Sequence, residues 1–112
     1  MSEAKEIFEE INTALGENPS HVEGFNAVYQ FELEGEEPYQ LVLRGENSYA
    51  KQGTDEEADC TLKMNTEDFK ALSEGNLNGT QAFMSGRLKI KGNMGLALKL
   101  QNILSSYKAA SK

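Results

Sequence analysis

The hydrophobic pattern changes period twice along this chain of 112 residues, and that change limits the fold more than any other feature. Between residues 26 and 64, apolar and polar side chains alternate with a period of two, as in strands with one buried face. On either side, the apolar residues recur at helical spacing. Four strands in succession predict a meander, and helices at both ends predict an α+β fold. The predicted strands cover residues 26–33, 39–44, 48–52 and 59–64.

Helices are predicted before and after these strands. The first covers residues 3–15, with Ser2 as the expected cap, Gly16 as the expected end and one apolar stripe. No linker or internal repeat divides the chain, so we expect one domain over residues 1–112 with a curved, mainly antiparallel five-stranded sheet and helices covering one face. The stripe of the first helix consists of Ala4, Ile7, Phe8, Ile11 and Leu15. The later elements are short helices at residues 65–75 and 80–85, a strand at 87–91 and a long helix at 93–107.

Composition excludes several classes of function. A single cysteine, Cys60, and a single histidine, His21, cannot form an internal disulfide or a Cys/His zinc site. We expect Cys60 to be a small buried hydrophobe and His21 to lie at the surface, with no catalytic triad, metal or cofactor. No apolar run reaches the ~18 residues of a membrane span. Residues 1–68 carry 17 acidic side chains against four basic ones, which argues against nucleic-acid binding.

The sign of the net charge is reversed after residue 68, since residues 69–112 contain one acidic side chain and seven basic ones. In the last predicted strand, three cations alternate with Leu88 and Ile90, so the cations would point outward and the apolar residues inward. One interpretation is a solvated edge that lysines protect from aggregation. The other is a weak contact with anionic lipid headgroups. The three cations are Arg87, Lys89 and Lys91.

The last predicted helix is apolar over more of its circumference than docking on a sheet requires. Its main stripe spans about 120°. Met94 and Leu98 fall outside that stripe, and Gln101 lies between them and it. They could pack on a neighbouring helix, such as the one bearing Phe69 or Phe83. Alternatively, they could line a cavity in which Gln101 supplies one polar contact. The stripe consists of Leu96, Ala97, Leu100, Ile103, Leu104 and Tyr107.

From Phe83 to Gln101, around the element Gly92-Asn93-Met94-Gly95, the sequence resembles the sterol carrier protein type 2 family of small lipid-transfer domains. A looser resemblance extends along the whole chain. It implies a five-stranded sheet whose helices enclose a hydrophobic tunnel, and noncatalytic binding of fatty acid, fatty acyl-CoA, sterol or another lipid. Asn93 looks like the cap of the last helix, worth ~1 kcal/mol. The residues that the resemblance places at the ligand are Phe69, Leu72, Phe83, Met84, Asn93, Met94, Leu98, Gln101 and Leu104.

We therefore expect a noncatalytic intracellular lipid carrier with no cofactor and at most weak, transient membrane contact. Residues 65–85, with Gly75, Gly79 and Gly86 among or beside them, are the candidate gate. A second interpretation is an accessory domain that presents a lipid substrate to a partner enzyme. A third, a hydrolase or thioesterase, would depend on His21, and no clustered acid, base and nucleophile supports it.

The two ends of the chain bear on the expected location. The first residues lack the basic and apolar regions of a secretory signal. Many eukaryotic members of the resembled family end in a Ser-Lys-Leu peroxisomal address, whereas this chain ends at Ser111-Lys112. We expect a cytoplasmic, prokaryotic protein, and a peroxisomal location is the alternative if the C-terminus is truncated.

Overall fold

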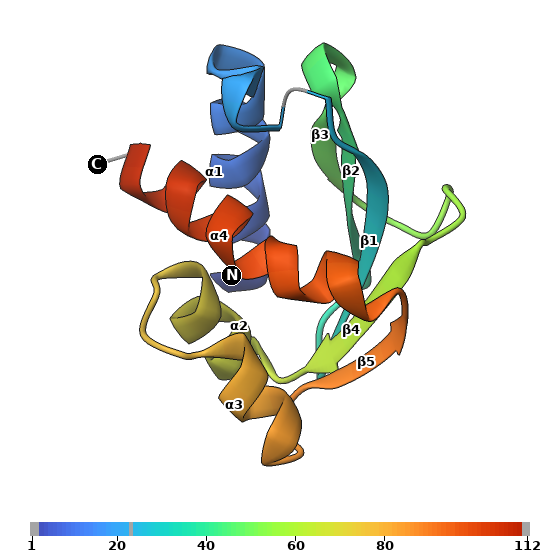
Figure 1. The fold of residues 1–112 in the computed structure, drawn as a ribbon, viewed down its shortest axis with the longest axis vertical. Coiled ribbons are helices and arrows are strands. Elements are labelled where there is room, and N and C mark those ends of the chain that lie inside the picture. Colours follow the sequence, from blue (N-terminus) through green and yellow to red (C-terminus); the bar gives the residue numbers. More distant parts are fainter. Residues whose placement is uncertain (1–2, 23, 111–112) are drawn as a thin grey trace.

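Helices α1 to α4 lie on one side of a five-stranded open sheet (Figure 1). The structure, a computed structural model, describes residues 3–22 and 24–110. The predicted α+β class is confirmed. The helices are α1 (Glu3–Glu17), α2 (Thr66–Ser73), α3 (Gly79–Met84) and α4 (Met94–Ala110), with short 3-10 turns at Pro19–Val22 and Gly45–Asn47. The strands are β1 (Asn26–Leu33), β2 (Tyr39–Arg44), β3 (Tyr49–Gln52), β4 (Cys60–Met64) and β5 (Lys89–Gly92).

The strand order in the sheet is β3-β2-β1-β4-β5. Strands β1 to β3 form an antiparallel meander, with Tyr29 opposite Leu41 and Leu41 opposite Ala50. The prediction that the meander continues into the fourth strand was wrong, because β4 pairs with β1 in parallel. Strand β5 then pairs antiparallel with β4, so the sheet is mainly antiparallel, as expected. Alternation shows which face of a strand is buried, but it carries no information about the neighbouring strand.

The loop at residues 53–59 covers the face of the sheet that is turned away from the helices. The Gln40 side-chain nitrogen donates to the Glu56 carbonyl oxygen at 2.7 Å and to Gln30 Oε1 at 2.8 Å. The Glu56 backbone N–H donates back to Gln40 Oε1 at 3.1 Å. These bonds satisfy two buried amides, which would otherwise be costly to remove from water. The strands thus bury residues on both faces, whereas the alternation predicted one buried face. The buried residues of the second face are Val28, Gln30, Gln40 and Val42.

The core between the sheet and the helices centres on four aromatic rings. Phe8 of α1 stacks on Tyr39, with 4.5 Å between ring centroids, and on Phe69, at 4.9 Å. Its contact with Phe31 is edge-on at 5.3 Å. Such pairs add stability beyond the area that they bury. The stripe predicted for α1 is buried at every position, so this helix is a core element along its whole apolar side.

The first helix is two residues longer than predicted at its C-terminal end. Helix α1 does not end at Gly16 as predicted but includes it and ends at Glu17. Pro19 then begins a 3-10 turn. The predicted Ser2 cap and the predicted surface position of the His21 side chain lie outside the described residues.

Capping and turn bonds set the elements that follow the fourth strand. The helix predicted from residue 65 begins as α2 at Thr66, and Asn65 is its cap, because the Asn65 side-chain oxygen accepts from the Asp68 N–H. Strand β5 begins at Lys89, two residues later than predicted. The reason is that the backbone N–H groups of Arg87 and Leu88 bind the Ala82 carbonyl oxygen and extend the turn after α3.

Candidate functional site

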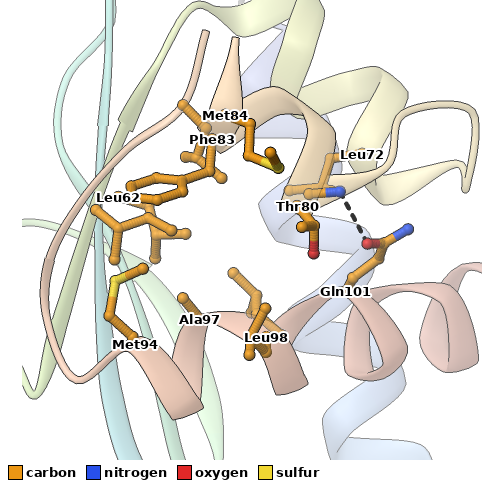
Figure 2. A pocket seen from close by; sticks show the side chains of 13 residues that line it. Leu62, Leu72, Thr80, Phe83, Met84, Met94, Ala97, Leu98 and Gln101 are labelled. Carbon is orange, nitrogen blue, oxygen red and sulfur yellow. Dashed lines mark hydrogen bonds between the residues drawn. The ribbon is translucent and has the colours of Figure 1, made fainter. Parts of the chain in front are cut away.

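A cavity of about 300 Å³ lies between α3, α4 and the β4–β5 end of the sheet (Figure 2). Carbon and sulfur atoms supply most of its surface, and the polar side chains on it are those of Thr80 and Gln101. An apolar pocket with few polar groups is the usual form of a small-molecule site, and 300 Å³ is at the small end of the range. The lining residues are Leu62, Leu72, Gly79, Thr80, Phe83, Met84, Leu88, Ile90, Met94, Ala97, Leu98, Leu100 and Gln101.

Four large apolar side chains surround the opening of this cavity, and we call them the apolar rim. The exposed fractions are 41% for Phe83, 80% for Met84, 41% for Met94 and 59% for Leu98. All four also line the cavity (Figure 2). Met94 and Leu98 are therefore exposed cavity residues and are not packed into the core, which decides between the two interpretations that the sequence left open.

A glycine and two hydrogen bonds position the start of α4. Gly92 has φ +101°, and a Cβ there would lie 2.6 Å from the Asp59 carbonyl oxygen, so only glycine fits. Asn93 Oδ1 accepts from the Leu96 N–H at 3.2 Å, which is the predicted cap. The Tyr29 hydroxyl donates to the Leu96 carbonyl oxygen at 2.6 Å, and burial raises the pKa of Tyr29. These contacts fix the helix that carries half of the apolar rim.

Gln101 connects α4 to the segment that precedes α3. Its Oε1 accepts from the Gly79 N–H at 2.9 Å (Figure 2). Its Nε2 donates to the Leu77 carbonyl oxygen at 3.4 Å. A Cβ at Gly79 would lie 3.3 Å from Gln101 Oε1, so the approach is close. The Gln101 amide therefore holds α3 over the cavity as well as supplying a polar group to its surface.

An ion pair anchors the other end of α3. The Arg87 guanidinium donates to both carboxylate oxygens of Asp68, which is buried at the start of α2. The hydrogen bond to Asp68 raises the pKa of Arg87. Arg87 was expected to be an outward-pointing strand cation, and the structure places it before β5 in this pair. The side chain that follows it, Leu88, is buried and lines the cavity.

The predicted ligand residues divide into two groups. Six of them line the cavity, namely Leu72, Phe83, Met84, Met94, Leu98 and Gln101. The remaining three do not. Phe69 belongs to the aromatic core, Leu104 is buried on the inner side of α4, and Asn93 acts as the cap. Both Phe69 and Leu104 have the residue type and the helical position of a wall residue. Phe69, however, packs against Phe8 of α1 and Phe31 of β1, and Leu104 is 1% exposed and outside the cavity lining.

Several cavity residues were absent from the predicted set. Leu62, Leu88 and Ile90 come from the sheet side, and strand alternation could have placed them there, since it predicted their inward orientation. Ala97 and Leu100 belong to the predicted docking stripe of α4, which proves to serve the cavity as well. Gly79 was predicted as a gate glycine but not as a lining residue, and Thr80 has no signal in the sequence that would single it out.

Groups for acid-base or metal chemistry are not gathered at this site. Within residues 3–22 and 24–110, no group of three His, Cys, Asp or Glu side chains is placed to hold a metal ion. Cys60 is buried in β4, and burial together with Asp59 raises the pKa of its thiol to about 11. It is therefore a neutral thiol near pH 7, as expected for a small buried hydrophobe. Among the described helices, none is long and apolar enough to cross a membrane.

An open five-stranded sheet whose helices leave a ligand-sized apolar cavity defines an α+β binding domain. The sequence profile of the SCP-2 sterol transfer family matches residues 8–105, and this chain belongs to that family. It is 44% identical over 87 residues to hydroxysteroid dehydrogenase-like protein 2 of Bos taurus, a match that covers 75% of this chain and 21% of that protein. The Xenopus tropicalis protein of that name is 40% identical over 111 residues, with 96% and 26% covered. The chain thus spans about a quarter of the length of these relatives.

Solved structures show the same fold. The apo form of sterol carrier protein 2 from Yarrowia lipolytica superposes with a TM-score of 0.74 and 27% identity, covering 90% of this chain and 88% of that one. Palmitated SCP2L2 from Aedes aegypti superposes with a TM-score of 0.73 and 25% identity, covering 94% and 96%. The resemblance noted in the sequence is therefore confirmed at the level of family and fold.

Proposed function

We propose that this chain is a noncatalytic carrier that holds a fatty acid, fatty acyl-CoA, sterol or similar lipid in the cavity between α3, α4 and the sheet. The observation that carries the proposal is the apolar cavity with its exposed apolar rim. Large apolar side chains gathered at a surface opening are typical of a binding site. The palmitated state of the similar Aedes aegypti protein supports an acyl chain as one ligand class.

The hydrophobic effect accounts for binding without any chemical step. Each methylene transferred from water to an apolar surface contributes ~0.8 kcal/mol, so ten methylenes contribute about 8 kcal/mol. The costs of association and ordering reduce this sum, and an affinity in the micromolar range is about what remains. Because the ligand binds the folded form, it also raises the melting temperature.

A long acyl chain requires more space than the cavity has in this structure. A methylene group takes up about as much volume as a water molecule, ~30 Å³, so 300 Å³ holds about ten. A longer chain must extend past the apolar rim or displace α3. The predicted gate at residues 65–85 is consistent with the second route. Gly75, between α2 and α3, and Gly86, after α3, have positive φ of 81° and 83°.

Native mass spectrometry of the purified protein tests the proposal, followed by organic extraction and identification of any released compound. We expect one lipid per chain, or uptake of a fluorescent fatty acid at micromolar concentration by the empty protein. Leu98→Ala should weaken that uptake, and Glu9→Ala on the outer side of α1 should not. A protein that is isolated empty and binds no fatty acid at tens of micromolar would refute a lipid cavity.

An acyl-CoA hydrolysis assay tests the noncatalytic part of the proposal. We expect no turnover above background, because the cavity presents only a threonine hydroxyl and a glutamine amide as side-chain polar groups. Turnover that disappears in His21→Ala would instead support the thioesterase interpretation.

The second candidate function is an accessory domain that presents a bound lipid to an enzyme. The observation that favours it is the match to hydroxysteroid dehydrogenase-like protein 2, of which this chain corresponds to about a quarter. Affinity capture with the chain as bait, in the presence of fatty acid, would identify one enzyme at stoichiometric amounts if this function is correct. A carrier that acts alone would capture none.

A further inference from the structure

We propose that Met84 and Met94 form an oxidation site that regulates lipid binding. Hydrogen peroxide converts their thioethers to sulfoxides, and the cavity then holds an acyl chain less tightly. The inference rests on the proposed function, because the modification acts on the lipid cavity. It adds a covalent modification of this chain and a condition, oxidation, under which the carrier releases its ligand.

The two thioethers are accessible from water and also belong to the cavity surface. Met84 of α3 is 80% exposed and Met94 of α4 is 41% exposed, and both side chains line the cavity. Figure 2 shows their sulfur atoms, in yellow, on opposite sides of the cavity. Peroxide in solution can therefore reach both side chains in the folded protein. Each oxygen atom that it transfers is added to the surface that would contact the lipid.

The other sulfur atoms of residues 3–22 and 24–110 are protected. Met64 is 4% exposed and belongs to the hydrophobic core. Cys60 is 1% exposed, and burial raises the pKa of its thiol to about 11, so little of the reactive thiolate is present near pH 7. Because oxidation of sulfur depends on exposure, we expect peroxide to modify the two rim methionines selectively, and Met84 before Met94.

Hydrogen peroxide is the only co-reactant that the oxidation requires. A lone pair of the sulfur attacks one peroxide oxygen, so that an S–O bond forms and the O–O bond breaks. The departing hydroxide takes up the proton of the transferred hydroxyl group and becomes water. The sulfur gives up two electrons, which reduce the peroxide, and the product is methionine sulfoxide. The step requires no acid, base or metal from the protein.

A sulfoxide weakens lipid binding because its oxygen is a hydrogen-bond acceptor that a bound acyl chain removes from water. Burial of such a group without a donor is costly. The side-chain donors of the cavity are the Thr80 hydroxyl and the Gln101 amide, and the amide already donates to the Leu77 carbonyl oxygen. We therefore expect the affinity for an acyl chain to fall roughly tenfold for each sulfoxide that the chain covers.

Exposure of the rim also makes the modification reversible. Methionine sulfoxide reductases return the sulfoxide to the thioether, and the exposed positions of Met84 and Met94 leave both side chains accessible to such enzymes. A bound acyl chain should have the opposite effect and cover the rim. The loaded carrier should therefore be oxidised more slowly than the empty one, so that lipid binding and oxidation oppose each other.

Peptide mapping by mass spectrometry, after treatment of the folded chain with hydrogen peroxide, tests the site. We expect the gain of one oxygen atom at Met84 first and at Met94 second, with Met64 unchanged. The same treatment in urea is the control and should oxidise Met64 as well, because unfolding exposes it. Oxidation of Met64 in the folded chain as fast as that of Met84 would overturn the proposed selectivity.

The affinity for a fluorescent fatty acid, measured before and after peroxide treatment, tests the regulation. In the unmodified chain we expect a loss of at least about tenfold, which methionine sulfoxide reductases reverse. Met84→Leu/Met94→Leu should show the same affinity before and after treatment, whatever its starting value. The matched control is Met64→Leu, a substitution that cores tolerate, and it should remain sensitive to peroxide. Equal losses in the rim double variant and in the unmodified chain would overturn the proposal.

The oxidation site and the carrier function fail in different ways in this experiment. If the untreated chain binds fatty acid and the chain oxidised at both rim methionines binds it equally well, the regulation is refuted and the carrier function stands. If the untreated chain binds no fatty acid, the carrier function fails, and the regulation fails with it whatever the peptide map shows.

Discussion

Helices α1 and α4 cover the same side of the sheet, but they differ in how far their apolar side chains are buried. Helix α1 buries its entire stripe, and its outer side is acidic and polar. Helix α4 buries Leu100, Ile103 and Leu104 and leaves Met94 and Leu98 exposed at a cavity. The first arrangement stabilises the fold, and the second keeps apolar surface available for a ligand.

The difference arises from what lies opposite each helix. Phe8 of α1 packs against three aromatic rings, from two strands and α2, whose centroids lie about 5 Å from its own. Opposite Met94 and Leu98 of α4 stands α3, a helix of six residues that is held at its two ends by Gln101 and by the Asp68–Arg87 pair. A short helix fastened at its ends leaves space beneath it, and that space is the cavity.

The largest expected effect is the loss of stability on truncating α1. Leu15 is 1% exposed, and Leu15→Ala should lower the free energy of unfolding by about 2–5 kcal/mol, because it leaves a cavity in a packed core. Urea denaturation measures the change. A loss below about 1 kcal/mol would mean that the α1 side of the core is loosely packed, and the contrast with α4 would disappear.

The same substitution on α4 should affect binding instead of stability. In Leu98→Ala the free energy of unfolding should change by no more than about 0.5 kcal/mol, because the side chain is exposed. The affinity for a fluorescent fatty acid should fall by up to about tenfold, since several buried carbon contacts are removed. Unchanged affinity together with a large loss of stability would show that Leu98 is a core residue.

Removal of the α4 cap should cost less stability than Leu15→Ala and less lipid affinity than Leu98→Ala. Asn93→Ala leaves the Leu96 N–H without its acceptor and should cost ~1 kcal/mol of stability. Because the first turn carries Met94, lipid uptake should weaken in parallel. Asn93→Asp, which retains an acceptor oxygen, is the control and should preserve both. If Asn93→Ala changes neither, the cap does not support the cavity wall.

The smallest effect is expected where a side-chain amide joins each helix to its neighbour. Gln101 Oε1 accepts from the Gly79 N–H, and Asn12 Oδ1 of α1 accepts from the Ala50 N–H at 3.0 Å. Gln101→Ala should speed hydrogen exchange at Gly79 by roughly fivefold, as expected for a bond worth ~1 kcal/mol, and should accelerate lipid release. Asn12→Ala should speed exchange at Ala50 and leave lipid release unchanged. Equal effects on release would show that Gln101 has no specific role at the gate.

The local hydrophobic pattern was sufficient to predict most of the helices and strands. Alternation located β1 and β2 to the residue. The start of α2 was predicted within one residue, because the groups that begin a helix lie within three residues of each other. The Asn93 cap came from the family resemblance and is confirmed. The excess apolar surface of α4 was visible as well, since helical geometry alone places Met94 and Leu98 off the docking stripe.

Part of the candidate site was not predictable in this way. Phe69 and Leu72 are three residues apart on one short helix, but Phe69 enters the aromatic core and Leu72 enters the cavity. Sequence spacing places both on the same side of α2. Only the position of α2 between α1 and α4 separates their environments.

The order of the elements, their capping signals, the acidic and basic halves and the surplus of apolar residues on α4 can all be predicted from the sequence, because they depend on neighbours along the chain. Three features could be established only from the folded chain: the parallel pairing of β1 with β4, the burial of Gln30 and Gln40 under the 53–59 loop, and the division between core and cavity. Each of these depends on contacts between residues far apart in sequence. The energies of such contacts depend on how whole elements pack, which no local periodicity records.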